Sequence, residues 1–167
     1  RQMCIRDSFS DQQPPTTKKQ LQQFLGMANY LSAHVTSYAL AVGPLYDAMK
    51  GKTDKAVFHL NEVQMKAFNE IKKLVKEAPK LALLDTSKPI HMECDASLVG
   101  SGSILYHEVE DENGKKRRNI VRYGSRRWSL TESLNHTSLE REAMAILIGA
   151  KQHMPFLLAC PETIIRT

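Results

Sequence analysis

Two carboxylates are the residues in this sequence best suited to chemistry. Asp95 ends a short apolar stretch in the segment ECDAS, and Glu142 lies in the first turns of a mostly apolar helical stretch. A carboxylate beside apolar surface is costly unless a partner compensates its charge. Each also has an ordinary alternative. Asp95 can cap the turn into Ala96 and Ser97, and Glu142 can interact with the helix dipole, which contributes only about 0.3–1 kcal/mol.

The expected elements place both carboxylates in one folding unit. Residues 89–97 predict a strand because apolar residues alternate along it: Ile90, Met92 and Cys94. A long helix follows a capping box made by Thr137 and Glu140, and residues 162–167 open another strand. Strand, crossover helix and strand form a right-handed parallel unit. Glu140 has a capping role there, whereas Glu142 has none.

If the two carboxylates converge, they form a site for a divalent cation. Mg²⁺ takes carboxylate and water oxygens as ligands. Two such ions about 3.5–4 Å apart activate a water molecule and stabilise the leaving oxygen of a phosphodiester. The sequence therefore raises the hypothesis of a magnesium-dependent nuclease site that contains Asp95 and Glu142.

Basic residues supply a candidate nucleic-acid surface. Two β-rich runs flank Asn113-Gly114, a pair that favours a hairpin because both central positions of a type I′ turn need positive φ. The cations on and after this hairpin are Lys115, Lys116, Arg117, Arg118, Arg122, Arg126 and Arg127. They can neutralise phosphates without reading sequence. For Lys115 to Arg118, a solvated hairpin tip is an equally good interpretation.

The glycine-rich turn after Asp95 is a second candidate contact. Ser97, Gly100 and Gly102 would let the backbone approach an RNA/DNA hybrid, in which the 2′-hydroxyl distinguishes RNA from DNA. Simple turn chemistry is the alternative for all three.

The N-terminal half predicts helices. Residues 1–13 have no usable period and are expected to be a disordered leader or an artefact. Helices are expected from Thr16, from Tyr38 to Met49 with a break at Pro44, and from Asn61 as N-cap to a stop at Pro79. The segment GKTDK at 51–55 is expected to be a turn or linker. The change from helical to strand period near residue 85 predicts a domain boundary.

Composition excludes several classes of protein. The 167 residues are 42% hydrophobic and 25% charged, with a net charge of +5, as in a globular domain or two small ones. No apolar run approaches the roughly 20 residues of a membrane span, so we expect an intracellular protein without a membrane partner. The cysteines, Cys4, Cys94 and Cys160, form no CxxC pair, and the histidines show no metal-ligand spacing. Neither a zinc site nor a disulfide framework is predicted.

Four blocks, in order, resemble the Pol polyproteins of gypsy-class LTR retrotransposons and retroviruses. PTTKKQLQQFLGMANYL resembles the thumb end of reverse transcriptase, and FHLNEVQMKAFNEIK resembles the connecting helix, although Leu60 stands where these families usually carry Trp. KPIHMECDASLVGSGSIL resembles the first two RNase H strands. YGSRRWSLTESLNHTSLEREAMAI resembles the Y-x-S-R-x-L segment and the helix whose Glu coordinates metal.

The resemblance implies an α/β fold: a C-terminally truncated RNase H-like mixed sheet with a crossover helix, preceded by a helical thumb and connection. It implies a thumb end over residues 14–54, a connecting helix over 55–86 and an incomplete RNase H-like domain over 87–167. The implied partners are an RNA/DNA hybrid and the remainder of the Pol polyprotein, within intracellular retroelement particles.

The resemblance also implies roles for the carboxylates. Asp95 and Glu142 match the first and second metal-binding acids of a site for two Mg²⁺ ions, and Arg126 matches the S-R pair beside it. The third acid would follow a strand that IIRT at 164–167 resembles, so this fragment is expected to be inactive alone. The alternative is a non-catalytic RNase H-like module that joins domains or grips a hybrid.

Overall fold

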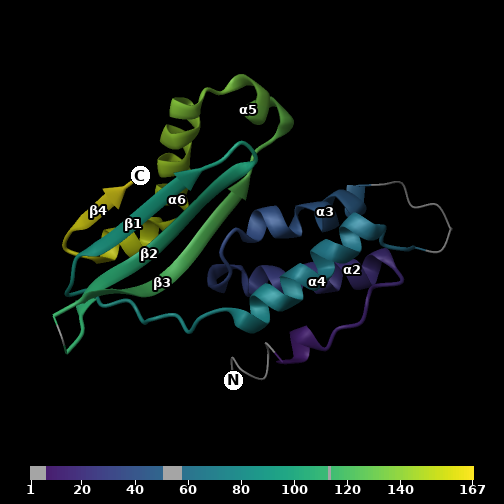
Figure 1. Cartoon of the computed structure of the whole chain (residues 1–167), viewed down its shortest axis with the longest axis horizontal. Coiled ribbons are helices and arrows are strands. Elements are labelled where there is room, and N and C mark those ends of the chain that lie inside the picture. The colour runs from purple at the N-terminus through teal and green to yellow at the C-terminus, as the bar shows by residue number, and fades with distance from the viewer. Residues whose placement is uncertain (1–6, 51–57, 113) are drawn as a thin grey trace. The chain divides into compact units, whose positions relative to one another are not determined.

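A computed structural model describes residues 7–50, 58–112 and 114–167 (Figure 1). It divides the chain into two compact units, Arg1–Ala78 and Pro79–Thr167. The second unit thus begins before residue 87, where the RNase H-like domain was expected to start, because the extended segment after Pro79 packs on the sheet. The amide of Ala82, for example, donates to the Ile120 carbonyl at 2.7 Å.

The first unit is helical, as predicted. It contains α2 (Lys18–Tyr30), the short 3₁₀ helix η1 (Ser32–His34), α3 (Tyr38–Lys50) and α4 (Glu62–Glu77). Asn61 is the N-cap of α4, which confirms that prediction. The predicted break at Pro44 is wrong, because α3 continues through it. Burial of apolar side chains on both sides of Pro44 offsets the lost helix hydrogen bond, which costs about 3 kcal/mol.

The structure departs from the expected disordered leader. Residues 7–10 form a helical turn, and Phe9 is only 1% exposed. The Phe9 ring stacks on Phe24 with centroids 4.7 Å apart, and Phe24 packs in turn on Phe68 at 4.5 Å. A single anchoring aromatic leaves no periodic pattern in the sequence, so the prediction missed it. The linker expected at 51–55 lies outside the described residues.

Replacing Gly26 with alanine should stabilise the first unit. Gly26 lies inside α2, and a Cβ added there meets no atom within 4 Å. Alanine is favoured over glycine in a helix interior, so we expect the free energy of unfolding to rise by about 0.5–1 kcal/mol. Chemical denaturation followed by far-UV circular dichroism measures it. The fluorescence of Trp128, in the second unit, serves as the control and should report an unchanged transition; a less stable first unit would contradict the open space above Gly26.

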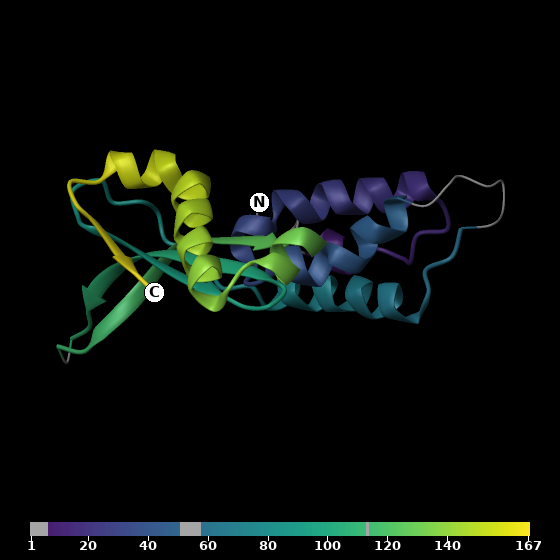
Figure 2. The same cartoon turned by 90° about the horizontal axis from the view of Figure 1, so that it is seen from above.

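The second unit is the predicted mixed sheet with a crossover helix. Its elements are β1 (Ile90–Ala96), β2 (Gly100–Glu110), β3 (Lys116–Arg127), α5 (Leu130–Asn135), α6 (Ser138–Ala159) and β4 (Thr163–Arg166). The strand order is β3-β2-β1-β4, with β4 parallel to β1 and the other pairs antiparallel. Helix α6 covers one face of the sheet (Figure 2).

Local signals explain these elements. The predicted capping box of Thr137 and Glu140 begins α6. The hairpin between β2 and β3 is also confirmed; Gly114 has a positive φ of 73°, while Asn113 lies outside the described residues. The alternating residues of β1 face α6 and form the core with Leu105, Val121 and Ala145. No helix in the described part of the chain could span a membrane.

Candidate metal centre and nucleic-acid interface

Asp95 lies at the carboxyl end of β1 with its side chain exposed. It pairs in register with Gly102 on β2. A Cβ added to Gly102 would meet no atom within 4 Å, so the space beside this residue is open. Successive side chains of a strand point to opposite faces, so Asp95 points away from the α6 face that Cys94 occupies. The ladder between β1 and β4 ends at the pair of Glu93 and Arg166, before it reaches Asp95. The carboxylate therefore lies at an open corner of the sheet.

The turn after Asp95 does not use its carboxylate. Ser97 caps the turn instead: the Ser97 Oγ accepts hydrogen bonds from the amides of Val99 at 3.3 Å and Gly100 at 3.2 Å. Local capping, the ordinary alternative for Asp95, is thus taken by Ser97. Gly100 is buried and its amide is occupied, whereas the backbone at Gly102 stays open to approach.

Glu142 lies half-buried on α6, near the same end of β1. Burial raises the pKa of the Cys94 thiol to about 11, and the nearby negative charge of Glu142 adds to this effect. The capping contacts of α6 belong to Glu140, as predicted. Because α6 starts at the carboxyl end of the parallel strands and returns the chain to β4, Glu142 and Asp95 occupy the same end of the unit.

The donor chemistry of these residues fits Mg²⁺, but their number falls short. Carboxylate oxygens are hard ligands of the kind Mg²⁺ prefers. Among residues 7–50, 58–112 and 114–167, no group of three or more acidic, histidine or cysteine side chains could hold a metal ion. Asp95 and Glu142 alone would leave most of the octahedral shell to water and substrate. Their convergence on one ion remains a prediction.

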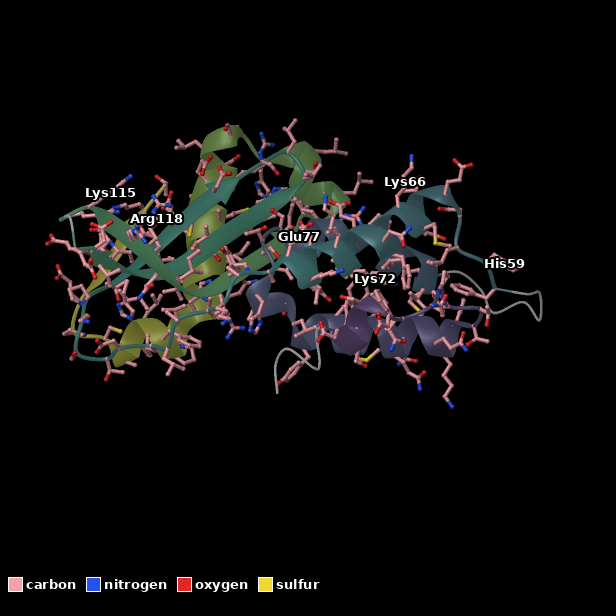
Figure 3. The ribbon with its side chains drawn as sticks, turned by 60° about the horizontal axis from the view of Figure 1, so that its bottom comes forward. His59, Lys66, Lys72, Glu77, Lys115 and Arg118 are labelled. Carbon is pink, nitrogen blue, oxygen red and sulfur yellow. The ribbon has the colours of Figure 1, made fainter. Side chains whose placement is uncertain are left out.

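Acidic partners already neutralise most of the predicted basic patch. Figure 3 shows Lys115 near the tip of the β2–β3 hairpin and Arg118 on β3. The ion pairs are Lys116–Glu108, Arg117–Asp111, Arg118–Glu93 and Arg126–Glu132, at 2.7–3.2 Å. Arg127 also has an interaction, and the Lys115 side chain is exposed. Exposed pairs contribute only about 0–1 kcal/mol, so a phosphate can compete for these cations.

The register of the hairpin separates the basic residues into two groups. Lys116 pairs with Glu110 at the hairpin tip, whereas Arg126 and Arg127 pair with Ser101 and Gly100 beside the turn after Asp95. At about 3.4 Å per residue, these two ends of β3 are roughly 35 Å apart. Only Arg126 and Arg127 therefore lie at the same end of the sheet as the candidate metal ligands.

Comparison with known proteins identifies the family. The sequence model of the family described as "RNase H-like domain found in reverse transcriptase" matches residues 60–164. The chain belongs to this family. The RNase H-like resemblance inferred from the four blocks is thereby confirmed.

Its relatives are retrotransposon polyproteins. The chain is 30% identical over 148 residues to the Pol polyprotein from transposon opus of Drosophila melanogaster, covering 84% of this chain and 14% of that protein. It is 29% identical over 143 residues to the transposon Tf2-3 polyprotein of Schizosaccharomyces pombe, covering 86% and 10%. The RNase H-like chain thus spans about a seventh or less of these relatives.

Solved structures confirm the fold. Two foamy viral protease–reverse transcriptase structures, one with double-stranded DNA and one with an RNA/DNA hybrid, match with TM-scores of 0.81 and 0.79 at 20% identity. Each match covers 96% of this chain, and 27% and 21% of the respective viral chains. The RNase H-like mixed sheet with its helices is thus a shared architecture.

A charged network on the open face of the RNase H-like sheet was not foreseen from the sequence. Arg166 on β4 donates to the Tyr106 hydroxyl at 2.9 Å and to Glu108 at 2.8 Å, reaching across β1. Glu108 also accepts a hydrogen bond from Lys116. The bond from Arg166 and, to a lesser extent, the bond from Lys116 lower the pKa of Glu108. The network anchors the short β4 beside residues 90–93 of β1. Only the strand register brings these residues together, so spacing gave no signal.

Proposed function

We propose that this chain is the part of a retroelement Pol polyprotein that runs from the thumb end of reverse transcriptase (residues 14–54) through a connecting helix (55–86) into the RNase H-like domain (87–167). The parent protein hydrolyses the RNA strand of RNA/DNA hybrids in a site for two Mg²⁺ ions. The observation that carries the proposal is the position of Asp95 and Glu142 at one end of the sheet. The cellular setting is an intracellular retroelement particle.

The residues of this chain have distinct roles in that reaction. Asp95 and Glu142 offer carboxylate oxygens as metal ligands. The chemistry that ions held there would supply is activation of a water molecule and stabilisation of the leaving oxygen. Arg126 and Arg127 attract the phosphates of the hybrid, and open space above Gly102 admits its backbone. The foamy viral complexes with nucleic acid share this fold and support such a surface.

Mn²⁺ titration followed by NMR tests the proposed site. Paramagnetic Mn²⁺ should broaden the amide signals around Asp95 and Glu142 in residues 1–167, and Asp95→Asn should abolish this effect. Glu110→Gln is the matched control, because Glu110 is an exposed carboxylate at the far end of the hairpin. Broadening that is equal in wild type and Asp95→Asn would refute the site.

A cleavage assay on an RNA/DNA hybrid completes the test. We expect residues 1–167 to cleave the hybrid in Mg²⁺ no faster than Asp95→Asn does, because two carboxylates cannot hold two ions. Robust turnover that Asp95→Asn abolishes would contradict this inactivity. Hybrid binding that survives both Asp95→Asn and EDTA but falls steeply with salt would instead favour the non-catalytic gripping module.

A further inference from the structure

The turn that follows the candidate ligand Asp95 lies in solvent. Residues 97–99 connect β1 to β2, and the side chains of Leu98 and Val99 are 66% and 57% exposed. Within the turn, the Ser97 amide donates to the Gly100 carbonyl at 2.9 Å. Because Leu98 and Val99 are mostly exposed, the position of the turn depends largely on hydrogen bonds.

The segment after β3 supplies those bonds. The indole Nε1 of Trp128 donates to the Ser97 carbonyl at 2.9 Å, and the Trp128 amide donates to the Val99 carbonyl at 3.1 Å. The hydroxyl of Ser133 donates to the carbonyl of Leu98 at 2.8 Å. All three successive carbonyls of the turn are therefore held by one segment that is distant in sequence.

Trp128 is itself fixed firmly enough to act as an anchor. It is the only tryptophan of the chain, and its side chain is 6% exposed. The Arg126 guanidinium lies 5.9 Å from the centroid of its ring and bonds to Glu132 at 2.7 Å. Glu132 completes a capping box with Ser129, which fixes the start of α5 directly after Trp128.

We propose that Trp128 is a positioning residue for Asp95, holding the 97–99 turn so that the carboxylate is presented to a divalent cation. This inference rests on the proposed function. The indole N–H is the essential group, because the side chain of phenylalanine or leucine at this position has no donor for the Ser97 carbonyl. Supporting groups outside the ligand set commonly change metal affinity by about 10–100-fold. Trp128 acts on Asp95 only through the backbone of the turn, so its effect on metal affinity should lie near the lower end of this range.

Trp128→Phe, which keeps an aromatic ring and removes the indole donor, tests the inference. Hydrogen exchange at the Val99 and Gly100 amides should accelerate severalfold. The Kd for Mn²⁺, measured from broadening of the Asp95 signal, should rise about threefold to tenfold. Tyr123→Phe is the matched control, because Tyr123 is a buried aromatic on β3, the strand that ends just before Trp128, and should change neither readout. Ser133→Ala, which removes one of the three bonds, should shift both readouts less.

The outcomes distinguish a failure of the proposed metal site from a failure of the positioning role of Trp128. If wild type binds no Mn²⁺ at Asp95, the proposed function fails and the positioning role fails with it. If wild type binds Mn²⁺ and Trp128→Phe binds it equally well, only the positioning role is overturned, even if exchange in the turn accelerates. If Trp128→Phe does not fold, Ser133→Ala carries the test, and an unchanged Kd for Mn²⁺ in Ser133→Ala overturns the inference.

Discussion

Gly149→Val is expected to lower the free energy of unfolding of the second unit by about 3 kcal/mol, the upper part of the range for overpacked cores. Gly149 lies in the middle of α6 and is buried against the sheet. A Cβ added there would lie 2.9 Å from the Cys94 sulfur, 3.3 Å from the Ser103 Cβ and 3.4 Å from the Met92 sulfur. The two methyl groups of valine would force α6 away from β1.

Urea denaturation followed by the fluorescence of Trp128 measures this loss. Gly149→Ala should cost less, because about 1 kcal/mol of helix propensity offsets part of the overlap. Ala143→Val is the matched control: Ala143 is exposed on the same helix, so only the intrinsic cost of a β-branched residue, below about 1 kcal/mol, is expected. Equal losses in Gly149→Val and Ala143→Val would contradict the close approach of α6 to the sheet.

Elements marked by local chemistry were predictable from the sequence. The capping box at Thr137 and the N-cap at Asn61 each involve residues within four positions of one another. The alternation of apolar residues in β1 follows from its one buried face. The start of the second unit and the helical turn at Phe9 were not, because both depend on packing against residues far along the chain. Pro44 shows the same effect, since buried neighbours override a local signal.

The candidate site divides in the same way. The types and positions of Asp95 and Glu142 could be proposed from the sequence, and the structure places both at one end of the second unit. The basic patch could not be judged, because the pairing of Arg118 with Glu93 and the separation of Lys116 from Arg126 follow from strand register. Trp128 was also missed, since its indole acts on a turn 31 residues away in sequence.

Buried His153 should make the second unit sensitive to acid. Its side chain is 0% exposed, and its Nε2 lies 2.9 Å from the Ser103 hydroxyl. Its Nδ1 has no hydrogen-bond partner among the described residues. Burial, and then the positive charge of Arg122, lower the pKa of His153 to about 4. The imidazole is therefore neutral in the folded protein throughout the mildly acidic range.

The direction of the pH effect follows from where the proton binds. An unfolded chain takes up a proton at His153 below a pKa of about 6.5, whereas the folded unit does so only near pH 4. Stability is thus fully present above pH 6.5 and falls as the pH drops toward 4, by about 3 kcal/mol in all. His153→Gln should be less stable at pH 7 but lose less between pH 6.5 and 4.5. The urea unfolding midpoint of each protein, measured from pH 6.5 to 4.5, tests this. If the two midpoints fall by the same amount, His153 binds its proton as readily in the folded unit as in the unfolded chain, which would contradict the prediction.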